Sequence, residues 1–204
     1  MDVADFREMF PPLNEENPPV YLDNACMTLR PKCVIDAVQN YYARNPSCAG
    51  RSVHRWGMSI SQTVSRTRRK LADHIGAKDA REVIFTPNAT HSINQVAAGL
   101  DWKQGDVVIT SDREHNSNLV PWLQQSISGA DLQTVKSRSD NQFDLEAFEE
   151  ACANAGKSLR VVSLVHVGNL DGVEIPVAEA AKIAHDYGAI VHVDGAQSAP
   201  HMPI

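Results

Sequence analysis

Short apolar runs alternate with amphipathic helical patterns through the second half of the chain. Strands are expected at residues 82–85, 106–110, 132–135, 160–165 and 189–194. Helices are expected between them, at residues 90–100, 116–127, 144–155 and 177–187. Strands that alternate with helices indicate a mostly parallel sheet with helices on both faces. The pattern therefore predicts the α/β class.

The first part of the chain has a different pattern. Its first twenty residues are rich in proline and acids, which predicts a helical turn and an extended arm, and residues 21–25 predict a short strand or an extended entry to the fold. Pro31 is favoured in the first turn of a helix, so a helix is expected from there to about Arg44. A second helix is expected over about 58–75, before Gly76, a residue typical of helix C-caps.

Composition and charge narrow the class of protein. The chain of 204 residues is 43% hydrophobic and 22% charged, as in ordinary globular proteins. Its net charge of -6 gives no electrostatic reason to expect a nucleic acid or an anionic membrane as partner. No stretch has the length of a membrane span, the first residues are acidic where a signal peptide is basic, and the four cysteines lack CxxC spacing. We therefore expect a cytoplasmic protein without a metal site.

Two polar segments follow predicted strands. Thr90, with Asn88 and Ala89, begins a helix after residues 82–85. Backbone N–H groups at such a helix start favour an anion, although simple capping of the helix explains the same residues. His115 follows residues 106–110, where its ring could stack on a planar ligand or move protons, or could be an ordinary surface histidine.

Two further polar segments follow the last predicted strands. Asn169 lies in a glycine-flanked loop, where it could donate a hydrogen bond or simply form a turn, and Asp171 is read as a turn residue or a solvated charge. Asp194 ends an apolar run and is followed by Gln197. This acid is either a buried carboxylate at the edge of the sheet or an acid that begins a turn.

The common position of these residues favours a single site. The carboxyl ends of parallel strands meet at one edge of a sheet, so Thr90, His115, Asn169 and Asp194 are expected to lie together. An anion site, a stackable ring, an amide donor and a buried carboxylate fit a phosphorylated, planar nitrogen heterocycle. Pyridoxal 5′-phosphate (PLP) meets this description, with the acid holding the proton of the pyridinium nitrogen. P-loop and dinucleotide-binding glycine motifs are absent from the sequence.

Six stretches carry a resemblance to a known family. They are Tyr-Leu-Asp-Asn-Ala at 21–25, Ser-Val-His-Arg at 52–55, Glu-Val-Ile-Phe-Thr at 82–86, Glu-His-Asn-Ser-Asn-Leu-Val-Pro-Trp at 114–122, His-Val-Gly-Asn at 166–169 and Val-Asp-Gly-Ala-Gln at 193–197. In these stretches the chain resembles the N-terminal half of class V aminotransferase-fold proteins, and among them the cysteine desulfurases of the SufS/CsdA type.

The resemblance implies a type I PLP-dependent transferase fold that is incomplete at the C-terminus. Residues 1–50 would form an N-terminal arm and helix, as part of the small domain or entry segment, and residues 51–204 a truncated PLP-binding large domain. The resemblance implies a role for each site residue. Ala89 and Thr90 would contact the phosphate, and Asp194 would pair with the pyridinium nitrogen. His115 would stack on the ring and take part in proton transfer, while Asn169 and Gln197 would hydrogen-bond the phenolic oxygen or its surroundings.

The resemblance also implies a substrate and partners. His54 and Arg55 would lie near the substrate entrance and reach toward a partner subunit, since the family is typically dimeric. The substrate would be L-cysteine, converted to L-alanine, with a sulfur-acceptor protein as a further partner. Family members often read Gly-Thr-Thr-Glu where this chain has residues 88–91, and a histidine pair where it has His115 and Asn116.

The resemblance includes functional residues that this chain does not contain. The cofactor-binding lysine of the family lies downstream of the Asp-Gly-Ala-Gln strand, the sulfur-accepting cysteine lies farther on, and none of the lysines here falls at the expected position. The 204-residue chain is therefore expected to be inactive by itself. Two alternatives remain open: another class V enzyme, such as an aminotransferase, an epimerase-like enzyme or a kynureninase-like hydrolase, and a non-catalytic scaffold.

Overall fold

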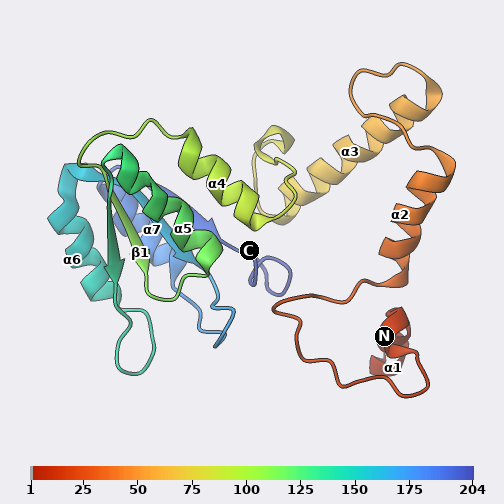
Figure 1. Ribbon diagram of the computed structural model, residues 1–204, viewed down its shortest axis with the longest axis horizontal. Coiled ribbons are helices and arrows are strands. Elements are labelled where there is room, and N and C mark those ends of the chain that lie inside the picture. Colours follow the sequence, from red (N-terminus) through yellow and green to blue (C-terminus); the bar gives the residue numbers. More distant parts are fainter. Residues whose placement is uncertain (1) are drawn as a thin grey trace. The chain divides into compact units, whose positions relative to one another are not determined.

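The computed structural model describes residues 2–204. Contacts between residues divide the chain into two compact units, Met1–Ile84 and Phe85–Ile204. Each unit is described by itself below (Figure 1). The domain assignment to residues 1–50 and 51–204 stays a prediction. No helix among the described residues combines the length and the apolar character that crossing a membrane requires.

The first unit is built from helices. In chain order they are α1 (Val3–Glu8), the 3₁₀ turn η1 (Pro11–Leu13), α2 (Lys32–Arg44), α3 (Arg55–His74) and the 3₁₀ turn η2 (Ala80–Glu82). Pro31 is the N-cap of α2, and Gly76 has a φ of +68° just beyond α3. The predictions of an early helical turn, of the helix after Pro31 and of the helix before Gly76 are confirmed, although α3 begins three residues before the predicted Met58.

The start of α3 is held by a close approach of two backbone segments. His54 is the N-cap, and its Nδ1 accepts a hydrogen bond from the backbone N–H of Gly57 at 3.4 Å. A Cβ on Gly57 would lie only 2.2 Å from the Cβ of Ser52. Glycine is therefore required at this position because the chain before the helix folds back against its first turn.

The second unit contains a parallel sheet of four strands. They are β1 (Val107–Ser111), β2 (Asp131–Val135), β3 (Leu159–Val165) and β4 (Ile190–Asp194). Their order is β2-β1-β3-β4, and all three pairings are parallel. The predicted class is confirmed, and the four strands begin and end within one residue of their predicted bounds.

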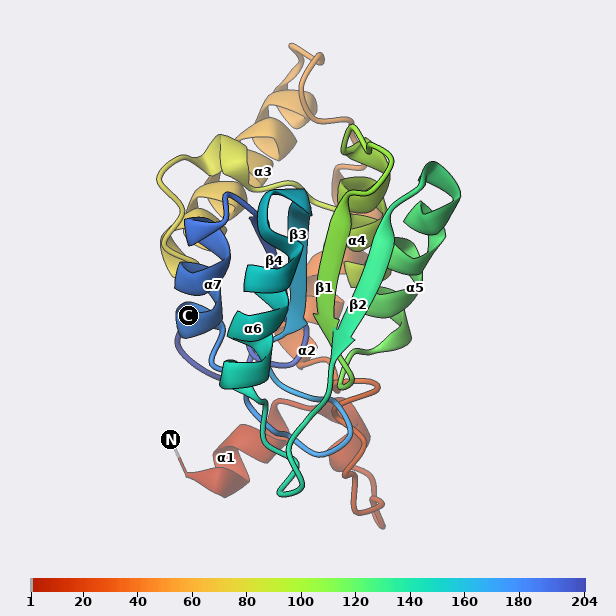
Figure 2. The same cartoon turned by 90° about the vertical axis from the view of Figure 1, so that its left-hand side faces the viewer.

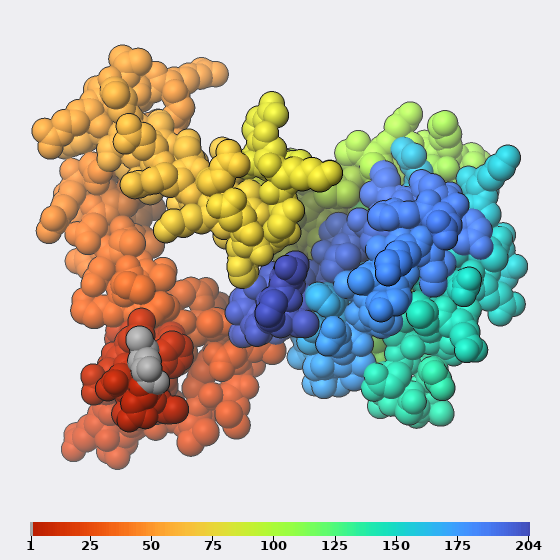
Figure 3. Space-filling view, turned by 180° about the vertical axis from the view of Figure 1, so that it is seen from behind, coloured from red at the N-terminus to blue at the C-terminus, as the bar shows by residue number. Residues whose placement is uncertain are grey.

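Helices cover both faces of this sheet. They are α4 (Ala89–Gly99), α5 (Asn116–Gln124) with the 3₁₀ turn η3 (Gln125–Ser128), α6 (Leu145–Ala155) with η4 (Gly156–Ser158), and α7 (Val177–Asp186). Figure 2 shows α6 and α7 in front of the sheet and α4 behind it. The outer side of α7 lies at the surface of this unit (blue in Figure 3).

Alternate residues of the strands pack into two apolar cores. Ile109 and Val162 belong to the core beneath α6 and α7, which contains the fully buried Phe148. Val108 and Val161 belong to the core beneath α4 and α5, which contains the fully buried Trp122. β1 and β3 are thus buried on both faces, as expected for central strands of a parallel sheet.

The strand predicted at residues 82–85 is wrong. Glu82 ends η2, residues 83–85 belong to no strand, and none of the four described strands pairs with them. Ile84 and Phe85 remain 70% and 47% exposed, and the boundary between the two units falls between them. A short apolar run becomes a strand only where a neighbouring strand pairs with it, and among the described strands none does so here.

Replacing Phe148 by alanine tests the core beneath α6 and α7. The side chain is fully buried, so Phe148→Ala is expected to lower the free energy of unfolding by about 3–5 kcal/mol. Urea unfolding followed by circular dichroism measures this change. The control is Leu170→Ala, because Leu170 is almost fully exposed and its truncation is expected to change stability by less than about 0.5 kcal/mol. Equal effects of the two substitutions would contradict this assignment of the core.

Candidate functional site

The order of the strands creates a crevice between β1 and β3. The chain leaves β1 toward β2 on one side and then returns to form β3 on the other side of β1. Connections that depart in opposite directions from two adjacent parallel strands leave space at their carboxyl ends, where open α/β sheets bind ligands. The register places Thr110 beside Ser163 and Val165 beside Asp194, so β1, β3 and β4 end close together.

A cavity of about 360 Å³ lies at this edge of the sheet. It is lined by residues 112–116, which follow β1, and by residues 168–171, which follow β3. We call it the site cavity. Two predicted site residues, His115 and Asn169, line it together. Within residues 2–204, no three His, Cys, Asp or Glu side chains come close enough together to hold a metal ion.

The start of α5 holds His115 and approaches the start of α4. His115 is the N-cap of α5, and its Nδ1 accepts a hydrogen bond from the backbone N–H of Ser117 at 3.1 Å. The hydroxyl of Ser117 lies 2.7 Å from the hydroxyl of Thr90, which is in the first turn of α4. Thr90 therefore reaches His115 through Ser117 and not, as the sequence suggested, by following a strand of the same sheet.

The capping of α4 is carried out by Asn88. Its Oδ1 accepts a hydrogen bond from the backbone N–H of His91 at 2.8 Å. Ala89 and Thr90 are exposed in the first turn, where the helix dipole favours negative charge. Capping by Asn88 and an anion at the residues that follow are compatible, because the cap satisfies only one of the N–H groups of the first turn.

Asp194 is a buried acid at the carboxyl end of β4. It is 6% exposed, and its Oδ1 accepts a hydrogen bond from the backbone N–H of Ala196 at 3.0 Å. It forms no salt bridge with any residue that the structure describes. Burial of a carboxylate without a cation is costly, so such a position favours a positively charged or N–H-bearing ligand. The pyridinium nitrogen of PLP is a group of this kind.

The remaining predicted residues lie in two places. Gln197 follows Asp194 in the turn beyond β4. His54 and Arg55 belong to the first unit, at the N-cap and first residue of α3. The contacts proposed for these three residues stay predictions.

Glu114, which was not among the predicted site residues, joins β1, α5 and β3. One carboxyl oxygen accepts hydrogen bonds from the hydroxyl of Ser111 at 2.5 Å and from the backbone N–H of Val165 at 3.0 Å. The other accepts one from the side-chain amide of Asn118 at 2.6 Å. Burial raises the pKa of Glu114, against the lowering effect of these hydrogen bonds, and the negative charge of Asp194 raises it further.

The hydrogen bonds of Glu114 continue beneath the site cavity to β4. The Asn118 side-chain oxygen accepts a hydrogen bond from the hydroxyl of Ser163 at 2.8 Å, and this hydroxyl lies 3.1 Å from Nδ1 of His192. Burial lowers the pKa of His192, although Asp194, two residues later, acts in the opposite direction. The sequence held one signal of this network, an acid and an amide four residues apart at a helix start, but it could not show that Asn118 would be buried and Glu114 partly buried.

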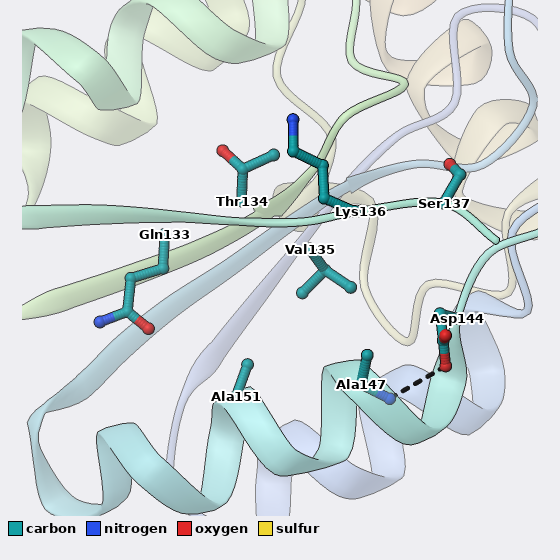
Figure 4. A pocket seen from close by; sticks show the side chains of 8 residues that line it. All are labelled: Gln133, Thr134, Val135, Lys136, Ser137, Asp144, Ala147 and Ala151. Carbon is teal, nitrogen blue, oxygen red and sulfur yellow. Dashed lines mark hydrogen bonds between the residues drawn. The ribbon is translucent and has the colours of Figure 1, made fainter. Parts of the chain in front are cut away.

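A second hollow, of about 420 Å³, lies between the outer edge of β2 and α6. Figure 4 shows Val135 directed toward Ala147 and Ala151 of α6, whereas Thr134 and Lys136 point away from that helix. The carboxylate of Asp144 already caps α6 by accepting a hydrogen bond from the N–H of Ala147 at 3.0 Å. None of the predicted site residues lies here, so the site cavity remains the candidate.

Comparison with known proteins establishes the family. The aminotransferase class-V family model matches residues 20–204. This chain belongs to that family. It is 38% identical over 210 residues to a probable cysteine desulfurase of Synechocystis sp., covering 98% of this chain and 49% of the relative. It is also similar to the crystal structure of the cysteine desulfurase CsdA from Escherichia coli, with 31% identity, a TM-score of 0.86, and coverage of 100% of this chain and 51% of that one.

A more distant structure shares the fold. It is a mutant of C-DES with glycine covalently linked to its PLP cofactor, 24% identical with a TM-score of 0.82, covering 97% of this chain and 51% of that one. The predicted type I fold and the resemblance to cysteine desulfurases of the SufS/CsdA type are therefore confirmed. The chain spans about half the length of the curated relatives it matches.

Glu114→Gln tests whether the pKa of the partly buried Glu114 carboxyl rises on folding. Because its folded-state pKa is raised, stability from this group is fully present below the unfolded value of 4.5 and is lost as the pH rises through the folded pKa. The stability of the natural chain minus that of the Gln variant is therefore expected to fall over this window, by about 1.4 kcal/mol for each unit of pKa shift. Urea unfolding between pH 4 and 8 measures it, and a difference independent of pH would contradict the prediction.

Proposed function

We propose that this chain forms the cofactor-binding half of a PLP-dependent cysteine desulfurase. The observation that carries the proposal is the buried carboxylate of Asp194, which lies without a cationic partner among the described residues, at the edge of the sheet that also carries the site cavity. Membership of the class V family and the desulfurases among its relatives support the same function.

The roles of the residues follow from their positions. Asp194 would keep a proton on the pyridine nitrogen, because a buried carboxylate stabilises the charged N–H form. His115 would lie against the ring, and its Nδ1 is already engaged with the N–H of Ser117, which leaves Nε2 to move a proton. Asn169 and Gln197 would act near the phenolic oxygen.

The phosphate would lie at the adjoining starts of α4 and α5. Ala89 and Thr90 offer exposed groups in the first turn of α4, and Ser117 adds a hydroxyl from the first turn of α5. Two helix N-termini supply N–H groups and favourable partial charge for a doubly charged anion. His54 and Arg55 would serve the substrate side.

When bound, PLP supplies an electron sink for the amino-acid substrate. In the proposed reaction, a cysteine thiol of the whole protein takes the sulfur of L-cysteine. The Cβ–S bond breaks, a persulfide forms, and a proton takes the place of sulfur on the product, L-alanine. We propose further that the protein acts as a homodimer, passes its sulfur to an acceptor protein, and works in the cytoplasm. The described cysteines, Cys26, Cys33, Cys48 and Cys152, are all free thiols.

Binding of pyridoxamine 5′-phosphate by the 204-residue chain tests the cofactor site. This amine form is used because it cannot react with surface lysines. Asp194→Asn keeps the shape of the side chain but removes its charge. Binding is expected to weaken at least about tenfold, because one charge-assisted hydrogen bond to the ring nitrogen is lost. Isothermal titration calorimetry measures the affinity. Asp186→Asn, an exposed acid in the last turn of α7, is the control and is expected to bind like the natural chain.

The activity is tested on the whole protein, isolated from its source through an affinity tag. Incubation with L-cysteine and a reducing thiol is expected to yield L-alanine and sulfide in equal amounts. Alanine formation from another amino donor, without sulfide, would overturn the desulfurase proposal in favour of an aminotransferase.

A further inference from the structure

Arg113 joins three loops at the wall of the site cavity. Its Nη1 donates a hydrogen bond to Oδ2 of Asp171 at 2.7 Å, in the loop after β3. Its Nε donates to the hydroxyl of Ser137 at 2.8 Å, and its Nη2 donates to Oδ1 of Asn141 at 2.8 Å, both in the segment after β2. We call these four residues the Arg113 clamp. Each guanidinium nitrogen has its own partner, which the planar fork of arginine permits and a lysine ammonium does not.

Asp171 also belongs to a hydrogen-bonded turn formed by its own loop. Its Oδ1 accepts a hydrogen bond from the backbone N–H of Val173 at 3.1 Å. The N–H of Gly168 donates to the carbonyl of Val173 at 2.9 Å, and the N–H of Gly172 donates to the carbonyl of Gly168 at 3.0 Å. Asp171 is therefore a turn residue, as the sequence suggested, but it is also the acid to which Arg113 is paired.

Gly168 is required by the position of this acid. A Cβ on Gly168 would lie 2.5 Å from Oδ1 of Asp171, which is closer than a real Cβ atom approaches another heavy atom. The side chain of Asp171 thus folds back over the backbone of Gly168, and Asn169 and Leu170 form the tip between them. Whatever holds Asp171 also holds the backbone that carries Asn169.

The segment after β2 gives Arg113 a firm support. Asp112 accepts hydrogen bonds from the hydroxyl of Ser137 at 2.6 Å and from its backbone N–H at 3.1 Å. Partial burial raises the pKa of Asp112, but the hydrogen bonds of Ser137 and the charge of Arg113 outweigh it and lower the pKa overall. The side chains of Arg113 and Asp171 are only 23% and 32% exposed, so solvent screens this pair less than an ordinary surface pair.

We propose that Arg113 is a positioning residue for Asn169, which it places by clamping the loop of residues 168–172 to the loop that carries His115. Both loops line the site cavity, so the clamp sets the distance across it. The importance of this distance for cofactor binding rests on the proposed function. The clamp itself is a property of the chain that can be measured without any ligand.

The first measurement is amide hydrogen exchange by NMR in the 204-residue chain. Arg113→Gln removes the charge and two of the three contacts, so the hydrogen-bonded amides of Gly168, Gly172 and Val173 are expected to exchange about tenfold faster, which corresponds to about 1.4 kcal/mol. Amides of Val108 and Val162, in the sheet, are expected to keep their rates. Arg138→Gln is the matched control, because the exposed Arg138 lies in the same segment as Ser137 and its side chain forms no hydrogen bond or ion pair with a described residue.

A double-mutant cycle isolates the pair. Asp171→Asn retains Oδ1 for Val173 but loses the ion pair, and it is expected to speed exchange by a similar factor. The double variant Arg113→Gln/Asp171→Asn is expected to exchange about as fast as either single variant. If the two effects multiply instead, Arg113 and Asp171 act independently and the proposal is overturned. Should Arg113→Gln prevent folding, Arg113→Lys and Asp171→Asn carry the same test, with a smaller effect expected for Arg113→Lys.

The second measurement links the clamp to the cofactor. Affinity for pyridoxamine 5′-phosphate is expected to fall about tenfold in Arg113→Gln, to fall less in Arg113→Lys and to stay unchanged in Arg138→Gln. A natural chain that does not bind this compound would refute the cofactor site, while hydrogen exchange would still decide the clamp. Unchanged exchange at residues 168–173 in Arg113→Gln would overturn the clamp even if the cofactor binds.

Discussion

The geometry of the site depends on β3 and its hydrogen bonds to the strands on either side. β3 pairs with β1 on one side and with β4 on the other, and it is buried on both faces. The two registers together determine where each neighbouring strand ends. Because all three strands run in the same direction, the segments that follow them emerge at one edge, and His115, Asn169 and Asp194 are carried there by the backbone.

At the point where β1 and β3 separate, a side chain takes the place of the backbone hydrogen bonds between the two strands. The Glu114 carboxyl accepts the N–H of Val165, for which β1 no longer offers a carbonyl, since the pairing of β1 with β3 ends at Thr110 and Ser163. A buried N–H without an acceptor would be costly, so this acid allows the crevice to open. Through Asn118 the same carboxyl is connected to the strand that ends in Asp194. The hydrogen-bond network of Glu114 thus both leaves space for the site and stabilises the sheet.

At the wall of the site cavity, charged residues hold the loops that follow β1, β2 and β3 together. Arg113 contacts the segments after β2 and β3, and Asp112 contacts Ser137 from the same loop. The buried network lies beneath the site cavity, and the clamp lies at its wall. Neither contains a predicted cofactor contact, yet both act on the loops that carry such contacts. Loops of this kind need external support because they contain few apolar side chains of their own.

Hydrophobic periodicity was sufficient to predict the helices and the four strands of the sheet, because burial on one or two faces leaves a repeating pattern in the sequence itself. It failed at residues 82–85, where the pattern predicted a strand but none of the four described strands pairs with the segment. His115, Asn169 and Asp194 could be predicted to share an edge because parallel strands impose it. The roles of Glu114 and Asp171 could not, since they depend on residues 51 and 58 positions away in the chain. The sequence alone thus determined the elements and the edge of the sheet, whereas only the tertiary structure decided which polar groups are buried, paired and brought together, because burial and pairing are properties of distant contacts.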